Sequence, residues 1–265
     1  MTAKADSGPV LLRADADGVA TLTLNRPARF NALSEDLLDA LQHELDAISR
    51  NESIRVVTIA GAGKAFCAGH DLKEMLGDIA KPAMQALFAK CSRMMLTLIR
   101  LPQPTIARVQ GLATAAGCQL VAQCDLAVAS EDARFATSGI NVGLFCSTPA
   151  VPVTRNLPRK QAMEMLLTGD FMDAATALQR GFVNRVVPAA DLDGAVADLA
   201  ARIVAKPPLS VAYGKRMFYR QAELGLEEAY RFAAEVMACN IDTEDAREGI
   251  KAFVEKRPMP AWKGR

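Results

Sequence analysis

Hydrophobic positions in the first 130 residues alternate between short β-rich runs and longer stretches with helical spacing. The short runs, typical of strands, cover residues 10–13, 19–24, 55–60, 104–109 and 126–129. Two stretches between them predict helices, one after Ser34 with apolar residues at 37, 38, 41, 45 and 48, and one over 82–101. Because strands that alternate with helices favour a parallel sheet covered by helices, the pattern predicts an α/β fold.

The second half of the chain has mostly helical spacing. A short strand is expected over 182–187, and helices over 190–205, 209–221, 226–239 and 242–253. The segment 135–148 has no clear period, which makes it a candidate pocket wall. We therefore expect a core over residues 1–200 that contains the functional site, and a helical C-terminal region over 201–265.

Composition excludes several classes of function. The chain has 265 residues, 51% of them hydrophobic, and a formal net charge of +1, so it has no general field to attract nucleic acid or an anionic membrane. No run approaches a membrane-spanning length and the first ten residues have no apolar signal core, so we expect a cytoplasmic protein. Six cysteines without a C-x-x-C pair, and two histidines, give little support for a metal site and favour free thiols.

Two glycine- and alanine-rich segments, AFCAGHDLKEM at 65–75 and GLATAAGCQ at 111–119, each read as a strand, a turn and the start of a helix. The helix that begins in the second segment is expected to continue to about Cys124, and an apolar strand over 126–129 follows it at once. Backbone N–H groups at the start of a helix are unpaired and lie at its positive end, so each turn can present one N–H to a developing negative charge. The alternative is that small residues in these turns only allow close helix packing.

Further segments accompany the two turns in a fixed order: LNRPARFNAL at 24–33, CD at 124–125, LPR at 157–159, AMEM at 162–165, LTG at 167–169, the stretch 174–181, and VNRVVP at 183–188. Together they resemble the crotonase family, also called the enoyl-CoA hydratase/isomerase superfamily, from about Leu12 to the end of the chain. The resemblance implies a crotonase (ClpP-like) spiral of ββα units with a C-terminal helical trimerisation region. It also implies a homotrimer or a dimer of trimers that acts on an acyl-CoA thioester.

By position, the resemblance assigns the two oxyanion-binding N–H groups to His70 and Ala116. Coenzyme A, as part of the substrate and not as a permanently bound cofactor, is expected against five residues: Arg29, Ala68, His70, Phe253 and Lys256. The last two are expected to contact the coenzyme A of a neighbouring subunit. For Arg29, Phe253 and Lys256 the alternative is a surface charge or a core aromatic.

The chain departs from the family pattern at the positions of the two glutamates that hydratases use to add water. These positions hold Gln119 and Gly139. An amide does not exchange a proton at accessible pH, and glycine has no side chain. Since each positioned acid or base is typically worth about 10²–10⁴ in rate, we expect standard hydratase activity to be weak or absent.

Other side chains are candidates to replace the glutamates. His70 adjoins the first N–H donor, with Glu74 four residues further on to orient it. A cluster on the expected pocket wall offers a nucleophile or water-binding groups: Cys146, Ser147 and Thr148. Asp71 is interpreted as a helix cap and Asp125 as a structural carboxylate. All of the candidates are also compatible with purely local structural roles.

Three hypotheses for function follow. The first is an enoyl-CoA hydratase-like enzyme in which another group transfers the proton. The second is a non-catalytic protein that binds acyl-CoA for sequestration or regulation. The third is a hydrolase of coenzyme A thioesters that uses a different side chain.

Overall fold

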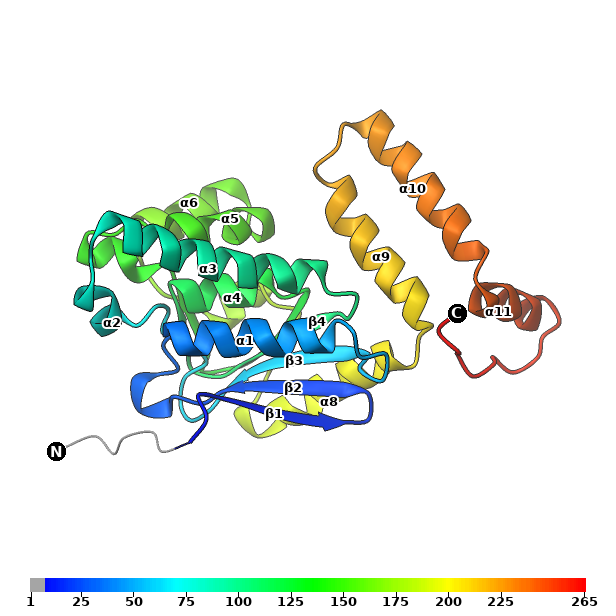
Figure 1. Ribbon diagram of the computed structural model, residues 1–265, viewed down its shortest axis with the longest axis horizontal. Coiled ribbons are helices and arrows are strands. Elements are labelled where there is room, and N and C mark those ends of the chain that lie inside the picture. The colour runs from blue at the N-terminus through cyan, green and yellow to red at the C-terminus, as the bar shows by residue number, and fades with distance from the viewer. Residues whose placement is uncertain (1–7) are drawn as a thin grey trace.

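The computed structural model describes residues 8–265, and its centre is a six-stranded sheet (Figure 1). The strand order is β1-β2-β3-β4-β6-β9. The strands are β1 (Leu11–Ala16), β2 (Val19–Leu24), β3 (Val56–Gly61), β4 (Thr105–Val109), β6 (Leu126–Ser130) and β9 (Arg185–Val187). The first pair is an antiparallel hairpin closed by Asp17 and Gly18, which have φ of 50° and 77°, and the other neighbours are parallel.

Helices cover both faces of this sheet. On one face lie α1 (Glu35–Ile48), α3 (Lys81–Arg100) and α4 (Ala116–Gln123), and on the other lies α8 (Leu192–Val204) after the short helix η3 (Ala189–Asp191) (Figure 1). Ser34 accepts a hydrogen bond from the N–H of Leu37 and so caps α1 as predicted. A separate cluster is buried between the sheet and α8: Val56, Ile106, Val128, Leu192, Val196 and Ala200.

A second, three-stranded sheet lies next to the first. It has the order β5-β7-β8, formed by β5 (Leu112–Thr114), β7 (Arg134–Ala136) and β8 (Met172–Asp173). Short helices surround it: η1 (Pro27–Arg29), α2 (Leu72–Gly77), η2 (Ser138–Val142), α5 (Ser147–Asn156), α6 (Arg159–Thr168) and α7 (Ala174–Gln179). The packed aromatic pair Phe135 and Phe182, with ring centroids 5.3 Å apart, is buried beneath this region.

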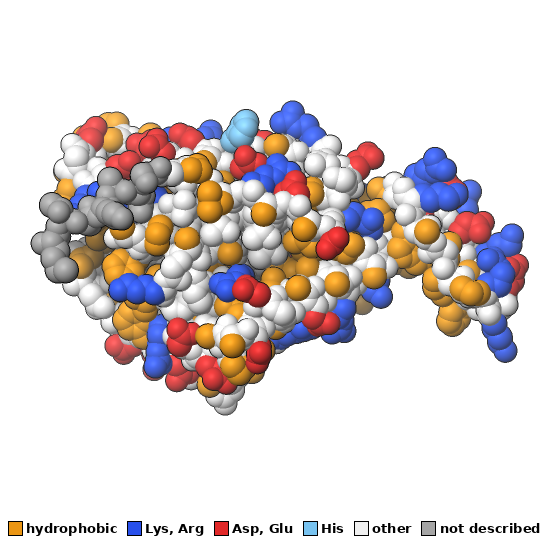
Figure 2. Space-filling view, turned by 90° about the horizontal axis from the view of Figure 1, so that it is seen from below, with side chains coloured by type: hydrophobic (Ala, Val, Ile, Leu, Met, Phe, Trp, Pro, Cys, Tyr) orange, Lys and Arg blue, Asp and Glu red, His pale blue; other side chains and the backbone are white. Residues whose placement is uncertain are grey.

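The last three helices, α9 (Pro208–Gln221), α10 (Leu226–Ile241) and α11 (Glu244–Val254), project from the main body, and we call them the C-terminal arm (Figure 1). Figure 2 shows the arm as a narrower projection with hydrophobic side chains at its surface. Large apolar residues of the arm are exposed in the single chain: Phe218, Leu226, Tyr230, Met237, Ile241, Ile250, Phe253 and Val254. The arm therefore has an apolar surface that this chain alone does not cover.

A buried ion pair attaches the arm to the body. The Lys215 ammonium lies 2.7 Å from Asp125 Oδ2 and donates to the backbone carbonyls of Leu98 and Gln103 at 2.7 and 2.9 Å. Asp125 also accepts from the hydroxyl of Tyr219 and from the N–H of Thr105, at 2.8 and 2.6 Å. Because both charges have several partners, this network fixes α9 against the body, and Asp125 has the structural role predicted for it.

Most predicted elements are present, with differences at their ends. The strand expected over 182–187 is limited to 185–187, and β5, β7, β8 and α5 were not predicted. Among residues 8–265, no helix is both long enough and apolar enough to cross a membrane, and no group of three or more His, Cys, Asp or Glu is arranged to hold a metal ion. The six cysteines are free thiols, as predicted, and five of them are buried. Most of the N-terminal stretch inspected for a signal core lies outside the described residues.

Candidate active site

The two glycine-rich turns lie against each other and are connected by backbone hydrogen bonds. Cys67 and Ala113 form a parallel bridge, in which the N–H of Cys67 donates to Leu112 at 3.0 Å and the N–H of Thr114 donates to Cys67 at 2.9 Å. The Thr114 hydroxyl adds a hydrogen bond of 3.1 Å to the carbonyl of Ala68. These contacts join residues 67–68 to the strand β5, which leads into α4, so neither turn can move without the other.

Glycines make this close approach possible. A Cβ atom on Gly117 would lie 2.0 Å from the carbonyl oxygen of Cys67, and one on Gly111 would lie 2.0 Å from that of Lys64. Gly69 has a φ of 93°, and its Cβ would lie 3.1 Å from the backbone nitrogen of Ala116. The residue just before His70 therefore contacts the residue that begins α4, which brings the two predicted N–H donors into the same region.

Local backbone geometry leaves both N–H groups free of partners in the described part of the chain. The bridge between Leu33 and His70 uses the N–H of Leu33 and the N–H of Asp71, not that of His70. Ala115 has φ of 50° and ψ of −118°, a strained conformation for a residue other than glycine, and it turns the chain sharply into α4. Ala116 is then the first residue of α4, where an N–H has no acceptor within the helix.

A cavity of about 360 Å³ opens at these turns. It is lined by Ala68, His70, Leu72, Met75, Phe88, Ala115, Ala116, Ser138, Gly139, Val142, Leu144, Phe145, Cys146, Ser147, Thr148 and Pro149. Seven residues singled out from the sequence are thus brought together here: Ala68, His70, Ala116, Gly139, Cys146, Ser147 and Thr148. The unperiodic segment expected to form a pocket wall lines the cavity as well. None of the described lining residues is Asp or Glu.

The His70 imidazole is part of the cavity wall, and its two ring nitrogens are buried. Neither nitrogen has a hydrogen-bond partner within residues 8–265, and the ring packs edge-on against Phe88 with centroids 5.5 Å apart. Burial lowers the pKa of His70 to about 4, so the ring is neutral at pH 7. The predicted pairing with Glu74 is wrong, because Glu74 Oε2 instead accepts the N–H of Glu35 at the start of α1.

Gly139 is held in a tight turn that a larger residue would disturb. The N–H of Leu144 donates to the carbonyl of Gly139 at 3.0 Å, which folds the following segment back onto the glycine. A Cβ at position 139 would lie 2.6 Å from the Leu144 carbonyl oxygen and 2.8 Å from the Cys146 sulfur. Burial raises the pKa of the Cys146 thiol, so it is protonated at neutral pH. Backbone and thiol therefore occupy the space beside Gly139.

Gln119 does not line the cavity. It lies on α4, in the first turns after Ala116, with its side chain 3% exposed. Its amide oxygen has no hydrogen-bond partner in the described part of the chain. Of the two positions at which the resemblance places glutamates, only 139 therefore lies at the surface of this cavity.

Arg29 is not among the described residues that line the cavity. It is half exposed, at the end of η1, and its guanidinium is 3.9 Å from a carboxylate oxygen of Asp71. Asp71 caps α2 as predicted, by accepting the N–H groups of Lys73 and Glu74. The Lys64 ammonium is 4.9 Å from the ring centroid of Phe30, next to Arg29. Two cations therefore lie on the side of the turns that faces solvent.

Phe253 and Lys256 lie at the end of the C-terminal arm, and neither lines the cavity of its own chain. Phe253 is 74% exposed. Figure 1 shows α11 at the far end of the molecule from α2, which borders the cavity. Any role for these residues in binding coenzyme A therefore requires a second subunit.

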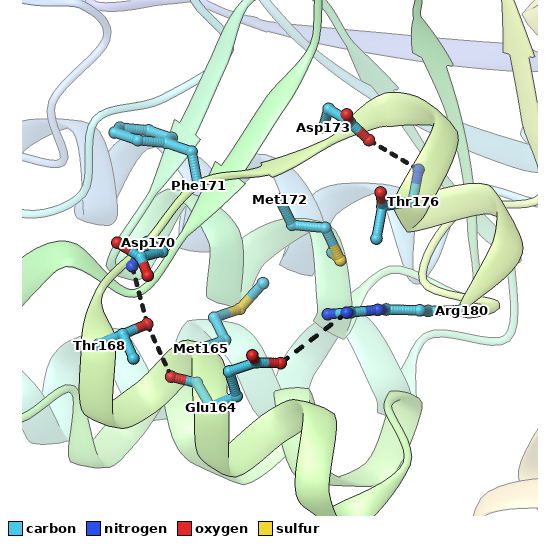
Figure 3. Close-up of a pocket in the computed structure, with 9 residues that line it drawn as sticks. All are labelled: Glu164, Met165, Thr168, Asp170, Phe171, Met172, Asp173, Thr176 and Arg180. Atoms are coloured by element: carbon cyan, nitrogen blue, oxygen red, sulfur yellow. Dashed lines mark hydrogen bonds and ion pairs between the residues drawn. The ribbon is translucent and has the colours of Figure 1, made fainter.

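A second hollow of about 220 Å³ is separate from this site (Figure 3). It lies between α6, β8 and α7, where the Arg180 guanidinium faces Glu164 at 3.8 Å beside Met165 and Met172 (Figure 3). None of the candidate catalytic or coenzyme A-binding residues named from the sequence is among the described residues that line this hollow. Three of its charged groups already have partners: Arg180 faces Glu164, and Asp173 accepts the N–H of Thr176 to begin α7.

Three cavity residues were missed in the sequence: Leu72, Met75 and Phe88. The first two lie on α2 and the third on α3, and they appeared only as apolar positions in helical stretches. Nothing in their spacing distinguishes residues that line a cavity from residues that fill a core. The lining residues within the segment 135–148 had a signal, the absence of a clear period.

Comparison with known proteins identifies the family. The model of the enoyl-CoA hydratase/isomerase family matches residues 14–265. The chain is 43% identical over 254 residues to enoyl-CoA hydratase domain-containing protein 3, mitochondrial, of Xenopus laevis, covering 96% of this chain and 86% of that protein.

Solved structures agree with this result. An enoyl-CoA hydratase from Mycobacterium smegmatis is 55% identical, with a TM-score of 0.94 over 96% of this chain and 99% of that one. Human enoyl-CoA hydratase domain-containing protein 3 is 41% identical, with a TM-score of 0.91 over 96% and 100%. The predicted α/β crotonase fold with C-terminal helices is thereby confirmed, and the chain belongs to the enoyl-CoA hydratase/isomerase family.

Proposed function

We propose that this chain binds an acyl-CoA thioester in the cavity and holds the thioester carbonyl oxygen between the N–H groups of His70 and Ala116. The observation that supports this most is the connection of the two turns, through the Cys67–Ala113 bridge and the contact of Gly69 with Ala116. When the thioester becomes an enolate or a tetrahedral intermediate, its oxygen gains negative charge. Two fixed N–H donors stabilise that charge, and loss of one such donor typically costs about 10²–10³ in rate.

We further propose that standard hydration of an enoyl thioester is weak or absent. Hydration requires one group to deprotonate water and another to protonate carbon, and the described lining of the cavity contains no carboxylate. At the two expected positions stand an amide, buried on α4, and a glycine whose surroundings leave no room for a side chain. These observations favour either chemistry with another proton carrier or binding without turnover.

His70 is the proton carrier that we propose for any turnover. The residue lines the cavity, its two buried ring nitrogens have no hydrogen-bond partner in the described part of the chain, and its neutral form can accept a proton or donate a hydrogen bond. The second candidate function, non-catalytic binding of acyl-CoA, is favoured by the missing carboxylates. No similar observation favours thioester hydrolysis, because the buried Cys146 thiol has a raised pKa and is a poor nucleophile.

Coenzyme A is expected to extend from the cavity toward solvent past Arg29 and Ala68. Arg29 and Lys64 lie where they could pair with its phosphates. We propose that the chain forms a homotrimer or a dimer of trimers through the C-terminal arm, which would bring Phe253 and Lys256 to the coenzyme A of a neighbouring subunit. The exposed apolar side chains of the arm support this assembly.

Assays of the full-length protein with crotonyl-CoA distinguish the possibilities. Hydration removes the conjugated thioester absorbance, hydrolysis releases a thiol detectable with a disulfide reagent, and calorimetry detects binding without either change. We expect binding, with hydration well below that of a family member with both glutamates. Failure to bind any acyl-CoA would contradict the proposal.

The role of His70 is tested by His70→Gln, with His43→Gln as the matched control. His43 is an exposed residue of α1. We expect any turnover to fall at least about tenfold in the first variant and to remain unchanged in the second. Turnover that is equal in both variants would exclude His70 as the proton carrier.

A cytoplasmic location remains a prediction from the sequence. The relatives from Xenopus and Rattus are named as mitochondrial proteins, and that name describes those proteins. Fractionation of the source cells would test the location directly.

A further inference from the structure

Beyond the two N–H groups, the walls of the cavity are apolar. Helix α2 contributes Leu72 and Met75, α3 contributes Phe88, and the segment after Gly139 contributes Val142 and its neighbours Leu144, Phe145 and Cys146. No charged side chain belongs to the described lining. Polar groups are limited to His70 and to the three hydroxyl residues at positions 138, 147 and 148. A ligand group deep in this cavity therefore meets mainly carbon and sulfur atoms.

Several of these apolar residues are exposed although they are large. Val142 is 69% exposed, Leu72 53% and Leu144 46%, and all three line the same cavity. Leu72 comes from α2 and the other two come from η2 and the segment that follows it, so apolar surface borders the cavity from two separate elements. Such apolar surface around a concave site is typical of a place that a ligand covers.

The size of the cavity limits the length of this ligand group. A volume of about 360 Å³ corresponds to about twelve water-sized groups, and a methylene is of similar size. The thioester and the adjoining part of pantetheine need some of that space. An acyl chain of about six to ten carbons fits what remains together with the apolar border.

Gly139 explains how the wall is kept in place. Because this residue has no side chain, the carbonyl of Leu144 and the thiol of Cys146 pack directly over it, and this brings the apolar segment 142–146 against the cavity. A side chain at position 139 would displace that segment. Glycine at position 139, where the family resemblance places a glutamate, therefore also allows this apolar wall to form.

We propose that the cavity selects acyl-CoA thioesters whose acyl group is an apolar chain of about six to ten carbons, in preference to short acyl groups and to acyl groups that end in a carboxylate. This inference rests on the proposed function. Burial of each methylene favours binding by about fourfold, and a carboxylate placed among these side chains would have no partner.

Calorimetric titration of the full-length protein with saturated acyl-CoAs, which cannot be hydrated, tests the inference. The probes are butyryl-CoA, octanoyl-CoA and the eight-carbon suberyl-CoA, which ends in a carboxylate. We expect octanoyl-CoA to bind at least about tenfold more tightly than either of the others. Equal or tighter binding of butyryl-CoA or suberyl-CoA would overturn the selectivity and leave the proposed function intact. If none of the three binds, both proposals fail.

A pair of variants locates the effect in the cavity. Val142→Asp places a charge on the apolar border at an exposed position, and Leu76→Asp places one at a position of α2 that does not line the cavity. We expect Val142→Asp to weaken the binding of octanoyl-CoA about tenfold and that of butyryl-CoA less than twofold. Leu76→Asp should leave both affinities unchanged. Equal weakening by the two variants would place the acyl chain elsewhere. Circular dichroism of each variant confirms that it is folded.

Discussion

The two glycine-rich turns are fully packed within a single chain, whereas the C-terminal arm leaves a large apolar surface uncovered. Around the turns, glycines at 69, 111 and 117 allow backbone to pack on backbone, and the N–H groups proposed as donors, those of His70 and Ala116, are positioned by contacts within one chain. In the arm, eight large apolar side chains remain exposed, and a buried ion pair at its base fixes its direction. Damage at the turns should therefore disrupt the candidate site directly, whereas damage at the arm should act through its attachment to the body.

The largest effect is expected from Gly117→Val. A Cβ at this position would lie 2.0 Å from the Cys67 carbonyl oxygen, so the added side chain must separate the two turns. We expect the free energy of unfolding to fall by about 4 kcal/mol or more, together with loss of acyl-CoA binding. Urea denaturation and calorimetry measure the two effects.

Gly194→Val is the matched control. Gly194 is an interior residue of α8, and nothing lies within 4 Å of its Cβ position. The free energy of unfolding should change by less than about 0.5 kcal/mol. A similar loss in both variants would mean that the contact between the turns is not the reason for glycine at 117.

The attachment of the arm is tested by Lys215→Met. This change removes the ammonium that lies 2.7 Å from Asp125 and leaves a carboxylate, 15% exposed, with only neutral partners. We expect a loss of about 3 kcal/mol in the free energy of unfolding. Octanoyl-CoA binding by the folded fraction should persist, because the network does not touch the cavity. Arg220→Met, an exposed residue of α9, serves as the control with a change below about 0.5 kcal/mol.

The site should also give stability a dependence on pH. Burial lowers the pKa of His70 from 6.5 to about 4, so between these values the unfolded chain binds a proton that the folded chain does not. The contribution of His70 to the free energy of unfolding is therefore fully present above pH 6.5. It decreases by about 2–3 kcal/mol as the pH falls toward 4. His70→Gln should remove that part of the slope, and His43→Gln should leave it. Urea denaturation at several pH values measures the difference, and identical slopes in the two variants would contradict it.

Sequence patterns predicted the parts of the structure that depend on local periodicity or on a family motif. The strands at 19–24 and 104–109 and the cap at Ser34 follow from such signals. Strand β5 has three residues and exists because it pairs with segments far away in sequence, so no local pattern revealed it.

At the site, the same limit applies to side chains. The family pattern placed His70 and Ala116 at the turns, and the structure brings both to one cavity. Spacing alone suggested that Glu74 orients His70, but the carboxylate reaches the start of α1 instead, because a partner from another element offered an unpaired N–H. The tight packing over Gly139 depends on a turn of the backbone, which the residue type at that position does not predict.

The smallest effect is expected from Gln119→Glu, which tests whether a single carboxylate at one of the two positions is enough for hydration. The residue is buried on α4, outside the lining of the cavity, and Gly139 provides no partner for it. Burial would also favour the protonated acid over the carboxylate. We expect hydration of crotonyl-CoA to rise by less than about tenfold, far below the effect of a positioned acid and base together.

Gln123→Glu, a buried residue one turn further along α4, controls for the general cost of burying a carboxylic acid there. Loss of crotonyl-CoA absorbance measures both variants against the unmodified protein. A rise of a hundredfold or more in Gln119→Glu alone would show that the second glutamate is dispensable in this scaffold. The two turns and one carboxylate at position 119 would then be sufficient for hydration. Glycine at position 139 would in that case affect only which acyl groups the cavity accepts.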